Sequence, residues 1–236
     1  MIQLRKGRDR GYADHGWLQS HHSFSFADYH DPAHMGVSTL RVLNEDRVAP
    51  GAGFPTHAHR DMEILSYVLE GALKHKDSLG HGSVIPAGDV QRMSAGSGIR
   101  HSEYNASASE PVHFLQIWIL PRRRGLAPGY EQRRIPAVEK RGRWRLVASP
   151  EPGKDALRLQ QDTAVYATVL APGETLEAVL DPRRTAWLQV ARGAVRANGR
   201  TLEAGDGARL DGEGALSLEA LGQAEVLRFD LPGTAP

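Results

Sequence analysis

Four side chains that can bind a metal ion lie in two short stretches of the sequence. His57 and His59 are separated by one residue, and so are His101 and Glu103. On a β-strand, side chains two residues apart point to the same face. If both stretches are strands, the three imidazoles and the carboxylate can converge on one point inside a β-barrel.

This donor set suits a first-row divalent metal ion. Octahedral coordination would leave positions open for a substrate and for dioxygen, and the site would keep a net positive charge that attracts an anionic substrate oxygen. Glu63 follows His59 by four residues and is an alternative carboxylate ligand. Spacing alone does not choose between Glu63 and Glu103.

Other histidines and aromatic residues are expected to have packing roles. Three histidines lack ligand spacing and are expected on the surface or in the core: His75, His81 and His113. Three more are expected to pack within the N-terminal segment, although they could approach the barrel mouth: His21, His22 and His30. Three residues could line an apolar mouth or simply belong to the core: Phe54, Met62 and Tyr104.

The composition predicts an all-β protein. The 236 residues include 25 Gly and 14 Pro, apolar runs are short, and long helical periodicity is missing. Such a pattern is typical of many short strands joined by turns. Strands are expected over residues 23–27, 38–43, 64–69, 83–85 and 114–120.

Composition and charge also exclude several functional classes. The chain has no Cys, so disulfides and thiolate ligands are excluded. No apolar stretch predicts a signal peptide or a membrane span, so we expect a cytoplasmic protein without membrane association. Residues 121–145 carry nine Lys or Arg against two Glu, but only two aromatics. We interpret this segment as a solvated connection, not a nucleic-acid surface.

The second half of the sequence repeats turn signals of the first half in the same order. The matching pairs are Ala49–Gly51 with Ala171–Gly173, Gly71-Ala72 with Gly193-Ala194, Ala87–Asp89 with Ala204–Asp206, and Leu120-Pro121 with Leu231-Pro232. We therefore expect two similar barrels, over residues 1–121 and 146–236, joined by residues 122–145.

The repeat places the chemistry in the first barrel. The positions equivalent to His57 and His59 are Val179 and Asp181 in the second copy. All 11 histidines lie between His15 and His113. The second barrel is therefore expected to keep the fold without the metal ligands.

The motifs resemble a known family. Gly51-x5-His57-x-His59-x3-Glu63 is similar to the first cupin motif, and Gly98-x2-His101-x3-Asn105 is similar to the end of the second. Residues 22–29, 41–47, 54–63, 67–72 and 101–105 more specifically resemble the pirin family, above all its bacterial quercetinase-like members. The resemblance extends over essentially the whole chain.

This resemblance implies a bicupin, in which two jelly-roll barrels follow one another and the N-terminal barrel holds the metal. It also implies that the fourth ligand is Glu103 and not Glu63. Pirins are described as quercetin 2,3-dioxygenases and, in eukaryotes, as nuclear iron-binding transcriptional co-regulators. We expect Fe²⁺ first, with Cu, Ni, Mn, Co or Zn as alternatives, since affinity alone would favour Cu²⁺ or Zn²⁺.

Two functions follow from these observations. In the first, the protein is a dioxygenase that opens the ring of a flavonol with O2 and releases carbon monoxide, with Glu103 as the candidate base. In the second, it is a metal-binding regulatory protein that acts through a protein partner, which only the basic segment 121–145 favours. A monomer is expected in either case.

Overall fold

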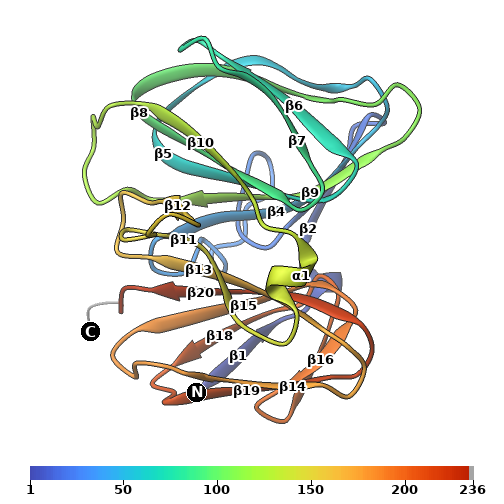
Figure 1. Ribbon diagram of the computed structural model, residues 1–236, viewed down its shortest axis with the longest axis vertical. Coiled ribbons are helices and arrows are strands. Elements are labelled where there is room, and N and C mark those ends of the chain that lie inside the picture. The colour runs from blue at the N-terminus through green and yellow to red at the C-terminus, as the bar shows by residue number, and fades with distance from the viewer. Residues whose placement is uncertain (234–236) are drawn as a thin grey trace.

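Strands dominate the structure, a computed structural model that describes residues 1–233 (Figure 1). The helices in this range are the 3-10 turn η1 (Gly7–Asp9) and the short α1 (Ala137–Lys140). Neither is long or apolar enough to cross a membrane, and no other helix occurs in residues 1–233. The prediction of an all-β protein is confirmed.

The first half of the chain forms one nine-stranded antiparallel sheet, here called the N-terminal sheet, in the upper half of Figure 1. One of the nine strands, β10 (Gly129–Arg134), comes from the basic segment 121–145 and pairs with β8. The other strands, in spatial order, are β2 (Gly11–Asp14), β3 (Leu18–His22), β4 (Leu40–Val48), β9 (Val112–Ile119), β5 (Gly53–Glu70), β8 (Asp89–Asn105), β6 (Ala72–Asp77) and β7 (Gly82–Pro86).

The second half forms two sheets. The larger one begins with β1 (Ile2–Arg5), so the start of the chain completes a sheet of the second half. Its other strands are β18 (Gly207–Asp211), β15 (Thr185–Arg192), β20 (Ala224–Leu231), β13 (Ala164–Leu170), β11 (Arg145–Ser149) and β12 (Leu157–Arg158). The smaller sheet has β14 (Thr175–Val179), β19 (Ala215–Ala220), β16 (Ala194–Ala197) and β17 (Arg200–Glu203).

The strand prediction for residues 23–27 is wrong. These residues form a loop in which the Ser25 backbone N–H donates to the His34 carbonyl and the Ser25 hydroxyl accepts from the Asp31 N–H. Phe24 packs against Trp187 of the second half, with ring centroids 4.9 Å apart. The alternation of the segment therefore reflects two separate apolar contacts of a loop, not the two faces of a strand.

The internal repeat is confirmed by the pairing order. The path β4–β9–β5–β8 in the first half has its counterpart in β13–β20–β15–β18 of the second half. Gly71 and Gly193 occupy the same turn with φ of 71° and 72°. A Cβ atom would lie 2.8 Å from the Pro111 carbonyl oxygen at Gly71, and 2.0 Å from that of Gln223 at Gly193. Each turn therefore requires glycine. The matching strand order and the matching turns together make the chain a bicupin of two jelly-roll units.

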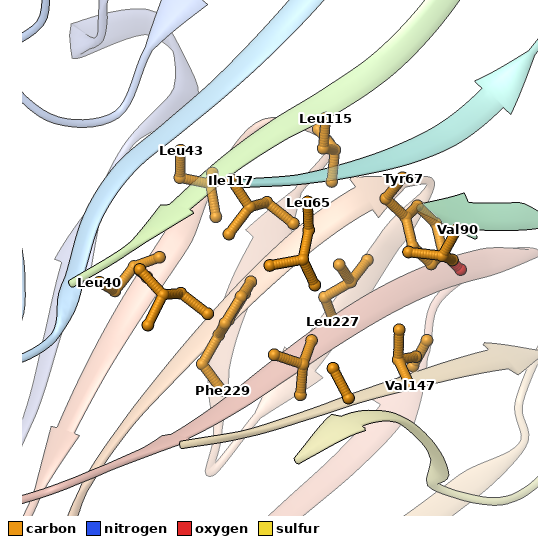
Figure 2. Packing of buried hydrophobic residues seen from close by; sticks show 14 of the residues in the cluster. Leu40, Leu43, Leu65, Tyr67, Val90, Leu115, Ile117, Val147, Leu227 and Phe229 are labelled. Carbon is orange, nitrogen blue, oxygen red and sulfur yellow. The ribbon is translucent and has the colours of Figure 1, made fainter. Parts of the chain in front are cut away.

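The largest apolar core lies between the two halves (Figure 2). Alternate residues of β4, β5 and β9, among them Leu43, Leu65 and Ile117, face the second half, which contributes Leu227 and Phe229. Each of these five side chains is at most 1% exposed. Both faces of β5 are covered beyond Met62, which explains its continuous run of buried residues instead of an alternating pattern.

We expect Leu65→Ala to lower the free energy of unfolding by about 2–5 kcal/mol, because it leaves a cavity between the two halves. Urea unfolding followed by circular dichroism and by tryptophan fluorescence would measure the change. One shared transition is expected, since both halves contribute to this core. The exposed Leu221→Ala is the control, with an effect of at most about 0.5 kcal/mol. Two separate transitions in the wild type would contradict a shared core.

Candidate metal centre

Strands β5 and β8 carry the four predicted ligands, and His101 is common to the two donor groups that contain them. His57 lies directly opposite His101 in the antiparallel register, and Glu103 follows His101 on the same face of β8. The register shifts on both sides of the histidine pair, between Phe54 and His57 and again between His59 and Asp61. These irregularities bend the ladder at the point where the side chains must converge.

The three imidazoles form a tight cluster. Their ring centroids are 4.5 to 4.9 Å apart, and one nitrogen from each of His57, His59 and His101 lies within 4.8 Å of the others. His57 Nδ1 lies 2.8 Å from the Pro55 carbonyl oxygen, to which it must donate, so Nε2 keeps its lone pair. An overlapping group with the same spacing joins His101 to His75 and Glu103.

His101 shows that the cluster fits a metal ion. Its side chain is buried, at 1% exposure, yet neither ring nitrogen has a hydrogen-bond partner among the residues that the structure describes. Leaving a buried polar group unpaired costs about 1–3 kcal/mol. A divalent cation is a partner that both the burial and the surrounding imidazoles would accept.

The protonation state of the imidazoles also suits metal binding. Burial, together with the neighbouring imidazoles, lowers the pKa of His59 to about 4 and that of His101 to about 3. Both rings are therefore neutral at pH 7, with a lone pair available. The donor set thus fits a divalent metal ion of the first transition row.

Glu103 is held by polar groups of the barrel interior. Its Oε1 accepts a hydrogen bond from the Ser66 hydroxyl at 2.9 Å, and its Oε2 accepts one from the Gln116 amide at 2.8 Å. Gln91 in turn donates to Ser66 at 3.2 Å. These partners share one row of the register across β8, β5 and β9. They fix the carboxylate in the way that outer-shell partners orient metal ligands.

Glu63 faces away from the histidines. Its Oε1 accepts from the Ser94 hydroxyl, and its Oε2 accepts from the backbone N–H of Gln160 in the second half, at 2.9 Å. Glu63 joins neither donor group within residues 1–233. Of the two carboxylates that spacing left open, Glu103 shares a donor group with His75 and His101, and it lines the same cavity as His57 and His59.

His75 lies beside the cluster, although its spacing did not suggest this. It sits opposite Glu103 in the β6–β8 register and is 1% exposed, so the expected core position is correct. Its Nε2 lies 3.1 Å from Asp77, and its ring centroid is 5.4 Å from that of His101. The sequence signal that could have found it is His75-x-Asp77, which has the same i, i+2 spacing as the two ligand pairs.

The other two histidines without ligand spacing have structural partners. His81 is part-exposed and lies 3.1 Å from a carboxylate oxygen of Asp77. His113 is buried and lies 3.0 Å from Glu45 Oε1. Neither belongs to a donor group among the described residues, although Asp77, the partner of His81, lies opposite His101 in the β6–β8 register.

A cavity of about 750 Å³ opens beside the cluster. Phe54 lines it and contacts Trp17 edge to face, at a centroid distance of 5.2 Å. Met62 packs elsewhere, against Ile64 and its neighbours, and Tyr104 is exposed. Within residues 1–233 neither of these two lines the cavity, so only Phe54 of the three expected mouth residues does.

His22 and Asp46 also line the cavity; the sequence left an approach to the barrel mouth open for His22 and did not suggest Asp46. The pKa of Asp46 is raised to about 7, mainly by burial. The hydrogen bond from the Ser20 hydroxyl opposes this shift, and the charges of Glu103 and Glu45 add to it. No cationic side chain pairs with Asp46 in the part of the chain that the structure describes. His30 is exposed, and His21 packs against Tyr12 of the N-terminal segment as expected, with the two rings tilted and their centroids 4.8 Å apart.

The second half has no such arrangement at the equivalent positions. Val179 is 90% exposed, and Asp181 pairs with Arg183 on the surface. The continuous β5 of the first half corresponds to β14 and β15, which residues 180–184 separate. The strand that would carry ligands is thus interrupted where they would stand.

Residues 3–119 match the Pirin family, and residues 146–231 match the Quercetinase C-terminal cupin domain. A quercetin 2,3-dioxygenase of Escherichia coli K12 is 49% identical over 232 residues, which cover 98% of this chain and 99% of the relative. The chain belongs to the pirin family. A pirin-like protein of Caulobacter vibrioides is 44% identical, over 98% of this chain and 99% of its own length.

Solved structures agree with this family assignment. The crystal structure of the pirin YhhW from E. coli superposes with a TM-score of 0.95 at 48% identity, covering all of both chains. A nickel(II) complex of YhhW superposes with a TM-score of 0.94 at 47% identity, over 99% of this chain and 100% of that one. The resemblance predicted from the sequence is therefore confirmed, and the donor cluster of this pirin fits a divalent metal.

We expect His57→Ala to lower the metal content of this pirin purified without added metal to less than about a tenth of the wild-type value, because a neutral donor is lost from the cluster. Inductively coupled plasma mass spectrometry of the purified protein would measure it. Val179→Ala, at the equivalent position of the second half, is the matched control and should keep full metal content. Metal loss in that control would refute a metal site confined to the first half.

Stability should depend on pH through Asp46. Its folded pKa of about 7 exceeds the ordinary value of 3.8. Between these values the folded state holds a proton that the unfolded state releases, so stability falls as pH rises, by up to about 4 kcal/mol. Asp46→Asn has no carboxyl group at this position, so its stability lacks this dependence on pH. Urea unfolding at pH 4, 6 and 8 should show the variant gaining on the wild type as pH rises, whereas parallel curves would contradict the shift.

Proposed function

We propose that His57, His59, His101 and Glu103 hold a divalent metal ion, and that the protein is a dioxygenase which opens the heterocyclic ring of a flavonol. The observation that carries this proposal is the position of the donor cluster at the wall of a large cavity that also has aromatic side chains in its lining. The E. coli relative named quercetin 2,3-dioxygenase supports the substrate class.

The cavity favours a flat aromatic substrate. Trp118 contacts His59 edge to face at 5.0 Å, and Phe26 contacts Trp118 in the same way at 5.4 Å. Trp17 and Phe54 line the same cavity. Rings arranged in this way contact an aromatic ligand through their faces and edges and exclude water from it.

The bound ion would act as a Lewis acid that lowers the pKa of the 3-hydroxyl of the flavonol. We propose Fe²⁺ as the native ion; nickel(II), which the E. coli relative binds in its crystal structure, is the first alternative to test. Neutral imidazoles and a carboxylate accept either ion.

Glu103 is the proposed base. A carboxylate oxygen of Glu103 would take the proton of the substrate hydroxyl, while the hydrogen bonds from Ser66 and Gln116 hold the carboxyl group in place. Two carbon–carbon bonds of the heterocycle then break, both atoms of O2 enter the ester product, and the carbon between these bonds leaves as carbon monoxide. The proton returns to the product, so no further reductant is needed.

We propose the same division of the chain as the sequence suggests. Residues 1–121 form the metal-binding unit, residues 122–145 connect it, and residues 146–236 form a unit without ligands. Two exchanges support close association of the units: β10 of the connection extends the N-terminal sheet, and β1 extends the larger sheet of the second half.

The iron-loaded protein should turn over quercetin aerobically with stoichiometric release of carbon monoxide. His57→Ala should lower the rate at least about 100-fold, since the bound ion is lost. The loss of the flavonol absorbance band would measure consumption of the substrate, and gas chromatography of the headspace would measure the carbon monoxide released. Metal-loaded wild type that is inert toward flavonols would refute the enzyme and favour the regulatory alternative.

A further inference from the structure

Asp46 differs from the other buried carboxylates in having almost no partners. Glu63 and Glu103 each accept hydrogen bonds on both oxygens, and Asp206 pairs with Lys6. Asp46 accepts one, from the Ser20 hydroxyl to Oδ1, and is only 3% exposed. Its Oδ2 has no partner among residues 1–233. A buried carboxylate that lacks both a cation and a full set of hydrogen bonds destabilises the fold.

The single contact of Asp46 belongs to a fixed chain of polar groups. The Ser20 hydroxyl donates its only proton to Asp46, so the same oxygen accepts from His22 Nε2, 2.9 Å away. His22 then carries its proton on Nε2, and its Nδ1 is a free acceptor with no partner in the described chain. Burial lowers the pKa of His22 to about 4, so the ring is neutral.

These groups lie on β3 and β4, and β9 separates β4 from β5, which carries His57 and His59. Ser20 pairs with Asp46, and His22 pairs with Asn44, across β3 and β4. Asn44 lies opposite Gln116 of β9, the residue that donates to Glu103. One row of the register therefore runs from Gln91 through Ser66, Gln116 and Asn44 to His22, and two of its members donate to Glu103. Every residue of this row is polar, whereas Asp46 lies opposite the apolar Phe114 of β9.

We propose that Asp46, with Ser20, His22 and Asn44 around it, forms a subsite that binds a phenolic hydroxyl of the substrate at the end remote from the metal donors. This inference rests on the proposed function, because it assigns the second end of the same flavonol. The first end would lie at His57, His59, His101 and Glu103.

The chemistry of the subsite defines its ligand. At pH 8, at which the binding test is done, Asp46 is ionised, so its Oδ2 and the His22 Nδ1 are acceptors and the complementary group is a donor. A phenolic hydroxyl is a strong donor and is neutral, whereas a carboxylate or phosphate would be repelled by Asp46. The ligand is therefore an aromatic compound with hydroxyl groups at both ends. A compound that has only the hydroxyl group directed to the metal would not use the subsite.

The test compares two flavonols by anaerobic titration calorimetry on the metal-loaded protein at pH 8. Quercetin has hydroxyl groups on both ring systems, whereas 3-hydroxyflavone has only the 3-hydroxyl. We expect Asp46→Leu to weaken quercetin binding at least about tenfold and to change 3-hydroxyflavone binding less than about threefold, as expected for loss of a hydrogen bond to a charged group. Asp46→Asn keeps the side-chain size and should weaken quercetin in the same direction.

Glu63→Gln is the matched control, since it neutralises a buried carboxylate of the same sheet that does not line the cavity. It should leave the ratio of the two affinities unchanged, and metal content should be full in every variant. Equal weakening of both flavonols by Asp46→Leu, or no weakening, would overturn the subsite. Tight, discriminating binding without aerobic turnover would refute the dioxygenase but keep the subsite. Wild type that binds neither flavonol would overturn both.

Discussion

The antiparallel pairing of β5 with β8 is the constraint on which the rest of the site depends. Every proposed ligand comes from these two strands, and His57 meets His101 directly across the ladder. Side chains alternate along a strand, so a slip of one residue would turn a whole ligand pair to the opposite face. The same two strands carry apolar residues of the shared core, such as Leu65 and Val90, on their other face. Apolar packing between the halves therefore holds the register that the donors require.

The interior of the first barrel is unusually polar for a covered sheet face. Ser66, Gln91, Gln116 and Asn44 are all at most 8% exposed and share one row of the register. Such a row is stable only where its members satisfy one another or a bound group. Glu103 accepts a hydrogen bond on each carboxylate oxygen, whereas Asp46 accepts one on a single oxygen. This asymmetry marks the second place at which a ligand can contribute.

Sequence patterns predicted the parts of this molecule that depend on local spacing. The pairs at His57 and His101 have a two-residue period, and the repeated turn glycines have a fixed order, so both could be recognised along the chain. The positions of Asp46 and His75 beside the cavity and the donor cluster could not be recognised in this way. Their neighbours in space depend on the order of the strands in the sheet, which the spacing of residues does not give. Residues 23–27 imitate a strand because two of their rings pack in different directions. The strand β10 was missed because its charged residues are typical of a connection.

The pairing of β1 with β18 has a consequence for how the chain can be divided. The first strand of the protein lies in a sheet built from its last third, and Lys6 and Gly7 contact Asp206 there. A cut within residues 122–145 would therefore leave the metal-binding half with an orphaned leading strand and the other half with an exposed sheet edge, which invites aggregation. During synthesis, likewise, the amino end can reach its final place only after the ribosome has made residue 211. The two barrels are similar in topology, but neither can complete its sheets before the other has been made.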